Sequence, residues 1–224
     1  MGSDEIFKRN RKELEERKAA KKTPKPGSML IVTEGTETEP LYFCGMANYI
    51  KAKYNGGQIN VIDVQGIGKG TRRVVEEAIK LASRSPFMYE NVWVAFDKDE
   101  FKDFDDAIKF AQEQGIKVAW SNQSFEYWLY LHFEYCISAL HRDEWFQKVD
   151  EIFQERQIGN GCYKKNLGNM FALFSSDGKL KTAIANAKRC EARYKNKLQS
   201  QCDPCTTVHH LVSSLKDYLT ELLK

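Results

Sequence analysis

The chain has 224 residues, enough for one large domain or for one domain with an appended helical part. Its aromatic content of 12% argues against disorder, and no apolar run reaches the length of about 20 residues that a membrane span requires. The net charge of +3 is too small to indicate a polyanionic partner by itself. The first residues lack the apolar core of a signal peptide, so we expect a cytoplasmic protein, not associated with membranes, whose six cysteines are reduced thiols.

Residues 1–28 are expected to form a basic arm ahead of the folded core. From Lys8 to Lys25 the chain carries nine Lys or Arg residues and three Glu residues. Pro24, Pro26 and Gly27 are expected to end any helix in this arm. Such an arm either attracts nucleic-acid phosphates or is a solvated tail, and the sequence leaves both interpretations open.

Between residues 29 and 120, short apolar runs alternate with amphipathic segments. The runs predict strands at 29–32, 59–64, 92–96 and 116–120, and the segments between them predict helices at about 40–50, 74–81 and 103–114. This alternation is typical of right-handed βαβ units, so we expect an α/β fold with a four-stranded, mainly parallel sheet flanked by helices.

From Ser121 onward the patterns are helical. Amphipathic periodicity predicts helices at about 125–133, 143–157, 180–198 and 206–223. We expect residues 123–224 to form a helical C-terminal part that packs on an α/β core of residues 29–122.

Three carboxylates follow two of the predicted strands. Glu34 comes after the first strand, and Asp97 and Asp99 come after the third. The carboxyl ends of parallel strands meet at one edge of a sheet, and residues two apart on an extended segment point the same way. Carboxylates gathered there repel one another unless a hard divalent cation binds. The sequence therefore predicts a site for Mg²⁺ or Mn²⁺ built from these three residues.

A buried strand ending in Glu34-Gly35 and a later strand ending in Asp97-x-Asp99 resemble the Toprim domain of topoisomerases, primases and overcoming-lysogenization-defect nucleases. More specifically, the chain resembles RloB-like proteins over about residues 28–215. The similarity lies in the segments I-V-T-E-G-x-x-T-E-P-x-Y-F from Ile31 to Phe43, Asp97-x-Asp99, S-N-x-x-F-E-x-W-L-x-L-H-F from Ser121 to Phe133, Tyr163-x-Lys165, and P-x-T-x-V-x-x-L-V from Pro204 to Val212.

The resemblance implies a Toprim-like, Rossmann-like fold in which the glutamate acts as acid, base or ligand and the Asp-x-Asp pair holds magnesium. It also implies a nuclease of antiviral defence by abortive infection, with RNA, including tRNA, or DNA as substrate and an AAA- or ABC-type ATPase as partner. The alternative is a non-catalytic Toprim-fold regulatory or adaptor subunit of such an ATPase complex. The sequence leaves open whether the chain forms a homo-oligomer.

Two residues depart from the family pattern. Many RloB-like sequences carry Pro-Cys where this chain has Gln123-Ser124. Because the neighbouring Glu126 is kept, we expect the local geometry to survive.

Glu126 is either a fourth carboxylate for a second metal ion or a first-turn acid that favours the helix dipole, with Asn122 or Ser124 as the helix cap.

A basic and aromatic patch, Tyr163, Lys164 and Lys165, lies in a glycine-rich loop. Lysine can hold a phosphate or stabilise transition-state charge. The resemblance favours a catalytic role for Lys165, and we expect the neighbouring Lys164 to contact nucleic acid. The alternative for residues 163–165 is a solvated loop without a functional role.

Glu39 is either a support for the metal or a first-turn helix acid.

The glycine-rich segment from Gly66 to Thr71 does not match a Walker motif, but its backbone N–H groups could bind a phosphate. Lys69, Arg72 and Arg73 would then contact the nucleic-acid backbone. A plain connector is the alternative.

Two further groups of potential ligands are less specific. His132 lies in an apolar pattern, so we expect a core histidine rather than a ligand. Cys202 and Cys205, followed by His209 and His210, have the residue types of a zinc site but not the usual spacing, and the same segment fits the start of a helix.

Overall fold

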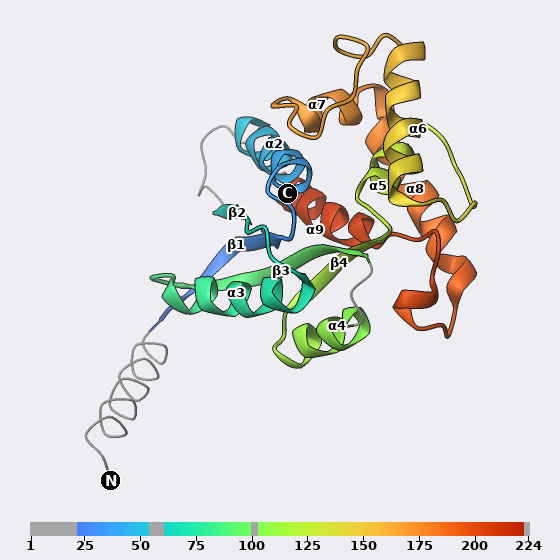
Figure 1. Cartoon of the computed structure of the whole chain (residues 1–224). Coiled ribbons are helices and arrows are strands. Elements are labelled where there is room, and N and C mark those ends of the chain that lie inside the picture. Colours follow the sequence, from blue (N-terminus) through green and yellow to red (C-terminus); the bar gives the residue numbers. More distant parts are fainter. Residues whose placement is uncertain (1–21, 54–60, 100–102, 222–224) are drawn as a thin grey trace.

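The computed structural model describes residues 22–53, 61–99 and 103–221, so the expected arm lies outside the described residues from 1 to 21. Four strands form one parallel sheet in the order β2-β1-β3-β4, which confirms the predicted fold class (Figure 1). The strands are β1 (Pro24–Thr33), β2 (Ile62–Gly66), β3 (Met88–Lys98) and β4 (Lys117–Asn122).

Helices connect the strands and continue after the sheet. Those between strands are α2 (Thr38–Lys53), α3 (Thr71–Arg84) and α4 (Phe104–Glu113). Those after β4 are α5 (Glu126–Tyr130), α6 (Arg142–Glu155), α7 (Met170–Ser175), α8 (Lys179–Glu191) and α9 (Val208–Glu221). The sequence did not predict the short helix α7, and α8 ends seven residues before the predicted end at 198.

The two faces of the sheet pack against different sets of helices. Leu30 and Val32 of β1 lie in a core with α3 and α4, whereas Met29 and Ile31 lie in a larger core with α2 and the helices after β4. Figure 1 shows α3 and α4 on one side of the sheet and α2 and α9 on the other. Because helices cover both faces, β1 has apolar residues at consecutive positions, as the sequence pattern predicted.

The first and the last strand of the sheet are longer than predicted. β1 begins at Pro24, since Pro24 and Lys25 pair with Met88 and Tyr89 of β3 ahead of an irregularity in the register. The prolines therefore start a strand, where a missing N–H is tolerated, and residues 24–28 belong to the sheet rather than to the arm. β4 likewise runs to Asn122, two residues beyond the predicted strand end at 120, and ends where the predicted α/β core ends.

The outer edge of β4 is paired with a segment that comes much later in the chain. Asn122 N donates to Cys205 O at 2.8 Å, and Thr207 N donates to Trp120 O at 2.8 Å. Ser121 and Thr206 form an antiparallel bridge between these two bonds. Residues 205–207 therefore act as a short additional strand and place the start of α9 beside the sheet.

The larger core contains His132, as predicted. The ring is 1% exposed, with Nδ1 3.0 Å from Trp128 O and Nε2 3.1 Å from the hydroxyl of Tyr42. Burial lowers the pKa of His132 to about 3, so the ring is neutral at physiological pH.

Within the described ranges, no helix combines the length and the apolar character that crossing a bilayer requires.

Candidate functional site

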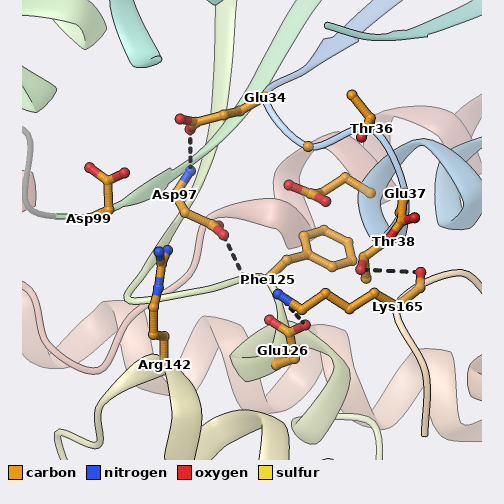
Figure 2. Close-up of a pocket in the computed structure, with 12 residues that line it drawn as sticks. Glu34, Thr36, Glu37, Thr38, Asp97, Asp99, Phe125, Glu126, Arg142 and Lys165 are labelled. Atoms are coloured by element: carbon orange, nitrogen blue, oxygen red, sulfur yellow. Dashed lines mark hydrogen bonds and ion pairs between the residues drawn. The ribbon is translucent and has the colours of Figure 1, made fainter. Parts of the chain in front are cut away.

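A cavity of about 310 Å³ lies beyond the carboxyl ends of β1 and β3 (Figure 2). Its lining consists of Glu34, Gly35, Thr36, Glu37, Thr38, Glu39, Asp97, Asp99, Phe125, Glu126, Arg142 and Lys165. The set contains every residue that the sequence proposes as catalytic, namely Glu34, Asp97, Asp99, Glu126 and Lys165. We call this cavity the acidic pocket, because six of the side chains are carboxylic acids and only two are cations.

Glu34 reaches the pocket because β1 and β3 are neighbours in the sheet. The backbone N–H of Glu34 donates to Ala95 O at 2.8 Å, which continues the strand pairing one residue beyond Thr33. The side chain then turns toward β3, where its Oε2 accepts a hydrogen bond from the N–H of Asp97 at 3.2 Å. The sheet therefore brings together two acids that are 63 positions apart in the sequence.

Asp97 and Asp99 both line the pocket, but they are oriented differently. Asp97 Oδ2 accepts a hydrogen bond from the backbone N–H of Phe125 at 3.1 Å, whereas Figure 2 shows the carboxylate of Asp99 turned away from Phe125. Within the described residues, no three carboxylates of the pocket bring their oxygens within 4.8 Å of one another. The acids surround an open space rather than forming a closed cage.

Glu126 forms the opposite wall of the pocket. Its side chain is buried, accepts a hydrogen bond from the hydroxyl of Tyr163 at 3.2 Å, and lies 3.6 Å from Nζ of Lys165. The carbonyl of Lys165 in turn accepts a hydrogen bond from Thr38 at 3.3 Å. Lys165 is thus held at the pocket by its backbone and its side chain, although more than half of the side chain is exposed.

The expected cap of α5 is wrong. The residue before α5 is Phe125, and no side chain caps the helix. The amide of Asn122 instead donates to Cys202 O at 2.9 Å, because β4 is longer than predicted and this side chain faces residues 202–205. Tyr163 also differs from the expected loop patch, since it is 1% exposed and packs among aromatic side chains, while Lys164 is exposed.

The electrostatics of the pocket favour bound cations. Burial, and then the nearby Asp99 and Glu39 carboxylates, raise the pKa of Glu34 to about 7, although the hydrogen bond from Asp97 N–H opposes the shift. Burial and the surrounding carboxylates also raise the pKa of Asp97 well above its usual range. Burial likewise raises the pKa of Glu39. Charge in the pocket is therefore poorly compensated by the chain itself.

The glycine-rich loop after β2 supports the segment that carries Glu34. The N–H of Ile67 donates to Thr33 O at 3.1 Å, and the N–H of Gly68 donates to Glu34 O at 2.9 Å. These two N–H groups are consequently used inside the protein. The loop serves as a brace for the acidic pocket, which favours the connector interpretation over phosphate binding by these two groups.

We expect Gly66→Ala to destabilise the chain by about 1–3 kcal/mol, because overpacking forces the backbone to shift. A Cβ at this position would lie 2.6 Å from Gly35 O and 3.0 Å from Cγ of Pro40. The free energy of unfolding in urea measures the effect. Gly168→Ala is the matched control, since a Cβ there meets no atom within 4 Å. Equal unfolding free energies for the two variants would contradict the bracing role.

The predicted nucleic-acid contacts are not in the acidic pocket. Lys69 lies 3.4 Å from Glu77, and Arg72 lies 3.5 Å from Glu76. Arg72 and Arg73 line a separate cavity at the start of α3. Their role in binding nucleic acid, like that of the exposed Lys164, stays a prediction.

Sequence reasoning missed Arg142 and Phe125. Arg142 is the first residue of α6, and its Nη2 donates to Gln123 O at 2.9 Å, which turns the guanidinium toward the acids (Figure 2). Gln123 itself has a positive φ of 68°, a conformation in which its carbonyl meets Arg142. No sequence pattern marks Arg142, because its position depends on how α6 packs against α5.

Comparisons with known proteins bear on the whole region that contains the acidic pocket. No curated protein and no solved structure matched the chain significantly. The family described as RloB-like protein matches residues 29–215, a range that includes every residue of the pocket. Most of the chain is covered by this match, and the protein therefore belongs to the RloB-like family.

Proposed function

We propose that the protein is a Mg²⁺-dependent, Toprim-type nuclease that hydrolyses phosphodiester bonds of nucleic acid in the acidic pocket. The observation that carries this proposal is the meeting, in one cavity, of Glu34 directly after β1 with Asp97 of β3 and Asp99 directly after β3. This is the arrangement that the resemblance to Toprim domains implies, with the acids at the carboxyl ends of two adjacent parallel strands.

The residues of the pocket fit a hard divalent cation. The acidic donors are all carboxylate oxygens, which Mg²⁺ and Mn²⁺ prefer over nitrogen or sulfur. Mg²⁺ keeps several waters and binds proteins through one or two carboxylates, so the separation of the acids suits it better than a closed cage would. Asp97, Asp99 and Glu34 would hold the ion, and Glu126 is the proposed ligand of a second one.

The bound ion would polarise a phosphate and lower the pKa of an attacking water. The chain supplies the remaining chemistry. Glu34, whose pKa burial raises to about 7 in the metal-free chain, is the proposed acid or base of the reaction when it does not itself bind the ion. Arg142 and Lys165 line the same pocket, and we propose that they bind the substrate phosphate and stabilise the negative charge that develops on it.

The substrate and partner follow from the resemblance rather than from the pocket alone. RNA, including tRNA, is one proposed substrate and DNA the other, with Lys69, Arg72, Arg73 and Lys164 as proposed contacts to its backbone. The proposed biological role is abortive infection in antiviral defence, together with an AAA- or ABC-type ATPase.

A nuclease assay with the full-length chain tests the proposal. We expect cleavage of RNA or DNA with Mg²⁺ or Mn²⁺ and none with a chelator, because the acids cannot activate a phosphate without the cation. The assay is run on the isolated chain and on the chain co-expressed with the proposed ATPase partner, so that activation by the partner is included. Asp97→Asn is the inactive reference, and Asp106→Asn, an exposed acid of α4 outside the pocket, is its matched control.

Cleavage by the wild type and by Asp106→Asn, with loss in Asp97→Asn, supports the nuclease. Binding of the ATPase without metal-dependent cleavage in either preparation supports the adaptor alternative instead. Cleavage that survives in Asp97→Asn contradicts the proposed site.

A further inference from the structure

A second group of potential metal ligands lies apart from the acidic pocket, where α8 ends and α9 begins. Glu191 is the last residue of α8, and His209 and His210 are in the first turn of α9. One ligand atom from each side chain lies within 4.8 Å of the others. None of the three residues lines the acidic pocket.

The distances within this group match those between ligands of one ion. Glu191 Oε2 lies 3.2 Å from Nε2 of His209 and 3.0 Å from Nε2 of His210. Two ligand atoms that each lie about 2.0–2.1 Å from a tetrahedral zinc ion are separated by about 3.3 Å. The side chains therefore need little rearrangement to share an ion.

His209 gives independent evidence for a ligand. Its side chain is 0% exposed, and neither ring nitrogen has a hydrogen-bond partner among the described residues. The nearby Glu191 oxygen is close enough but is not directed as a hydrogen bond requires. Buried polar groups are almost always satisfied, so a buried imidazole that lacks a directed hydrogen bond and faces a carboxylate and a second imidazole is suited to bind an ion.

The position also offers access to solvent. Glu191 and His210 line a cavity of about 740 Å³ together with Trp120 and Thr207. An ion bound by three side chains could take its fourth ligand, a water molecule, from this cavity. Two imidazoles and one carboxylate are typical zinc ligands, whereas Mg²⁺ prefers oxygen ligands only.

We propose that Glu191, His209 and His210 form a zinc-binding site that fastens the end of α8 to the start of α9. The site does not use the cysteines that suggested zinc in the sequence, since Cys202 and Cys205 are not part of the group. The ion would hold α9 directly after residues 205–207, which pair with β4.

Zinc titration of the full-length chain tests this site. The protein is stripped of metal with a chelator and titrated with Zn²⁺ in a calorimeter in the presence of excess Mg²⁺, which occupies sites that have only oxygen ligands. We expect one Zn²⁺ per chain and a higher unfolding temperature with zinc. His210→Ala and Glu191→Gln should each weaken binding by about a hundredfold, equivalent to about 3 kcal/mol.

These variants change side chains that are partly or largely exposed, so the fold should tolerate them better than a change at the buried His209. His141→Ala, an exposed histidine near Asp143 at the start of α6, is the matched control and should bind zinc as the wild type does. The Co²⁺ form should lack the strong near-ultraviolet band of thiolate ligands. No zinc binding, unchanged binding in both variants, or a thiolate band would each overturn the proposal.

Discussion

Glu34→Gln is expected to abolish cleavage and, in the absence of metal, to stabilise the folded chain. Activity should fall by about a thousandfold, because the pocket loses a metal ligand and a proton-transfer group. Stability should rise by about 1–2 kcal/mol at pH 8, a figure discounted for the partial exposure of the side chain. The stabilisation arises because the amide carries no charge among buried carboxylates.

The pH dependence of this stabilisation has a definite sign. The pKa of Glu34 is about 7 in the folded chain and about 4.5 when the residue is exposed. Between these values the folded state holds the proton more tightly, so stability falls as the pH rises from 4.5 to 7 and then levels off. The advantage of Glu34→Gln should therefore be largest at pH 8 and shrink toward pH 4.5.

Urea unfolding of the metal-free chain at several pH values measures this effect. Glu113→Gln makes the same chemical change at an exposed position at the end of α4, and it should alter neither cleavage nor stability. A stability change in Glu34→Gln that does not vary with pH would show that burial and repulsion do not govern this carboxyl. A fully active Glu34→Gln variant would remove Glu34 from the proposed mechanism.

Tyr163→Ala is expected to destabilise the chain by about 3–5 kcal/mol, as the loss of a large buried aromatic side chain does. The Tyr163 ring is 1% exposed and lies 5.1 Å from the ring of Phe146 and 5.5 Å from that of Phe153. The hydroxyl also donates to Glu126 in the wall of the acidic pocket. The free energy of unfolding by urea measures the loss.

Tyr163→Phe separates the packing of the ring from its hydrogen bond. This variant keeps the ring and should cost about 1.5–3 kcal/mol, the usual contribution of a hydrogen bond to a charged group. It should also lower cleavage. Without the hydrogen bond from Tyr163, the carboxylate of Glu126 is held less firmly, and Glu126 in turn positions Lys165. Equal losses of stability in the two variants would mean that the hydrogen bond, rather than the packing, is the dominant contribution.

Much of the sheet could be predicted because its strands are buried on both faces. The run from Val92 to Phe96 has no polar residue, which is the pattern of a strand that helices cover on both sides. The first five residues of β1 could not be predicted in the same way. Pro24 and Gly27 favour a break, and it is the pairing with Met88 and Tyr89, far along the chain, that makes this segment a strand.

The acids of the site could be predicted from local order, because Glu34 and Asp99 directly follow β1 and β3, and Asp97 is the second-last residue of β3. Their different orientations could not be, since the turn of Asp97 toward Phe125 depends on where β4 leads into α5. Arg142 escaped prediction for a similar reason. Its guanidinium reaches the pocket only because the helix α6 is packed against α5, which no short pattern in the sequence records.

The pairing of residues 205–207 with β4 has a consequence for the solution behaviour of the chain. An uncovered strand edge presents unpaired N–H and C=O groups, and other chains can join it and begin to aggregate. A chain shortened before residue 205 would expose this edge at Trp120 and Asn122. The last part of the protein therefore protects the sheet against self-association, in addition to carrying the start of α9.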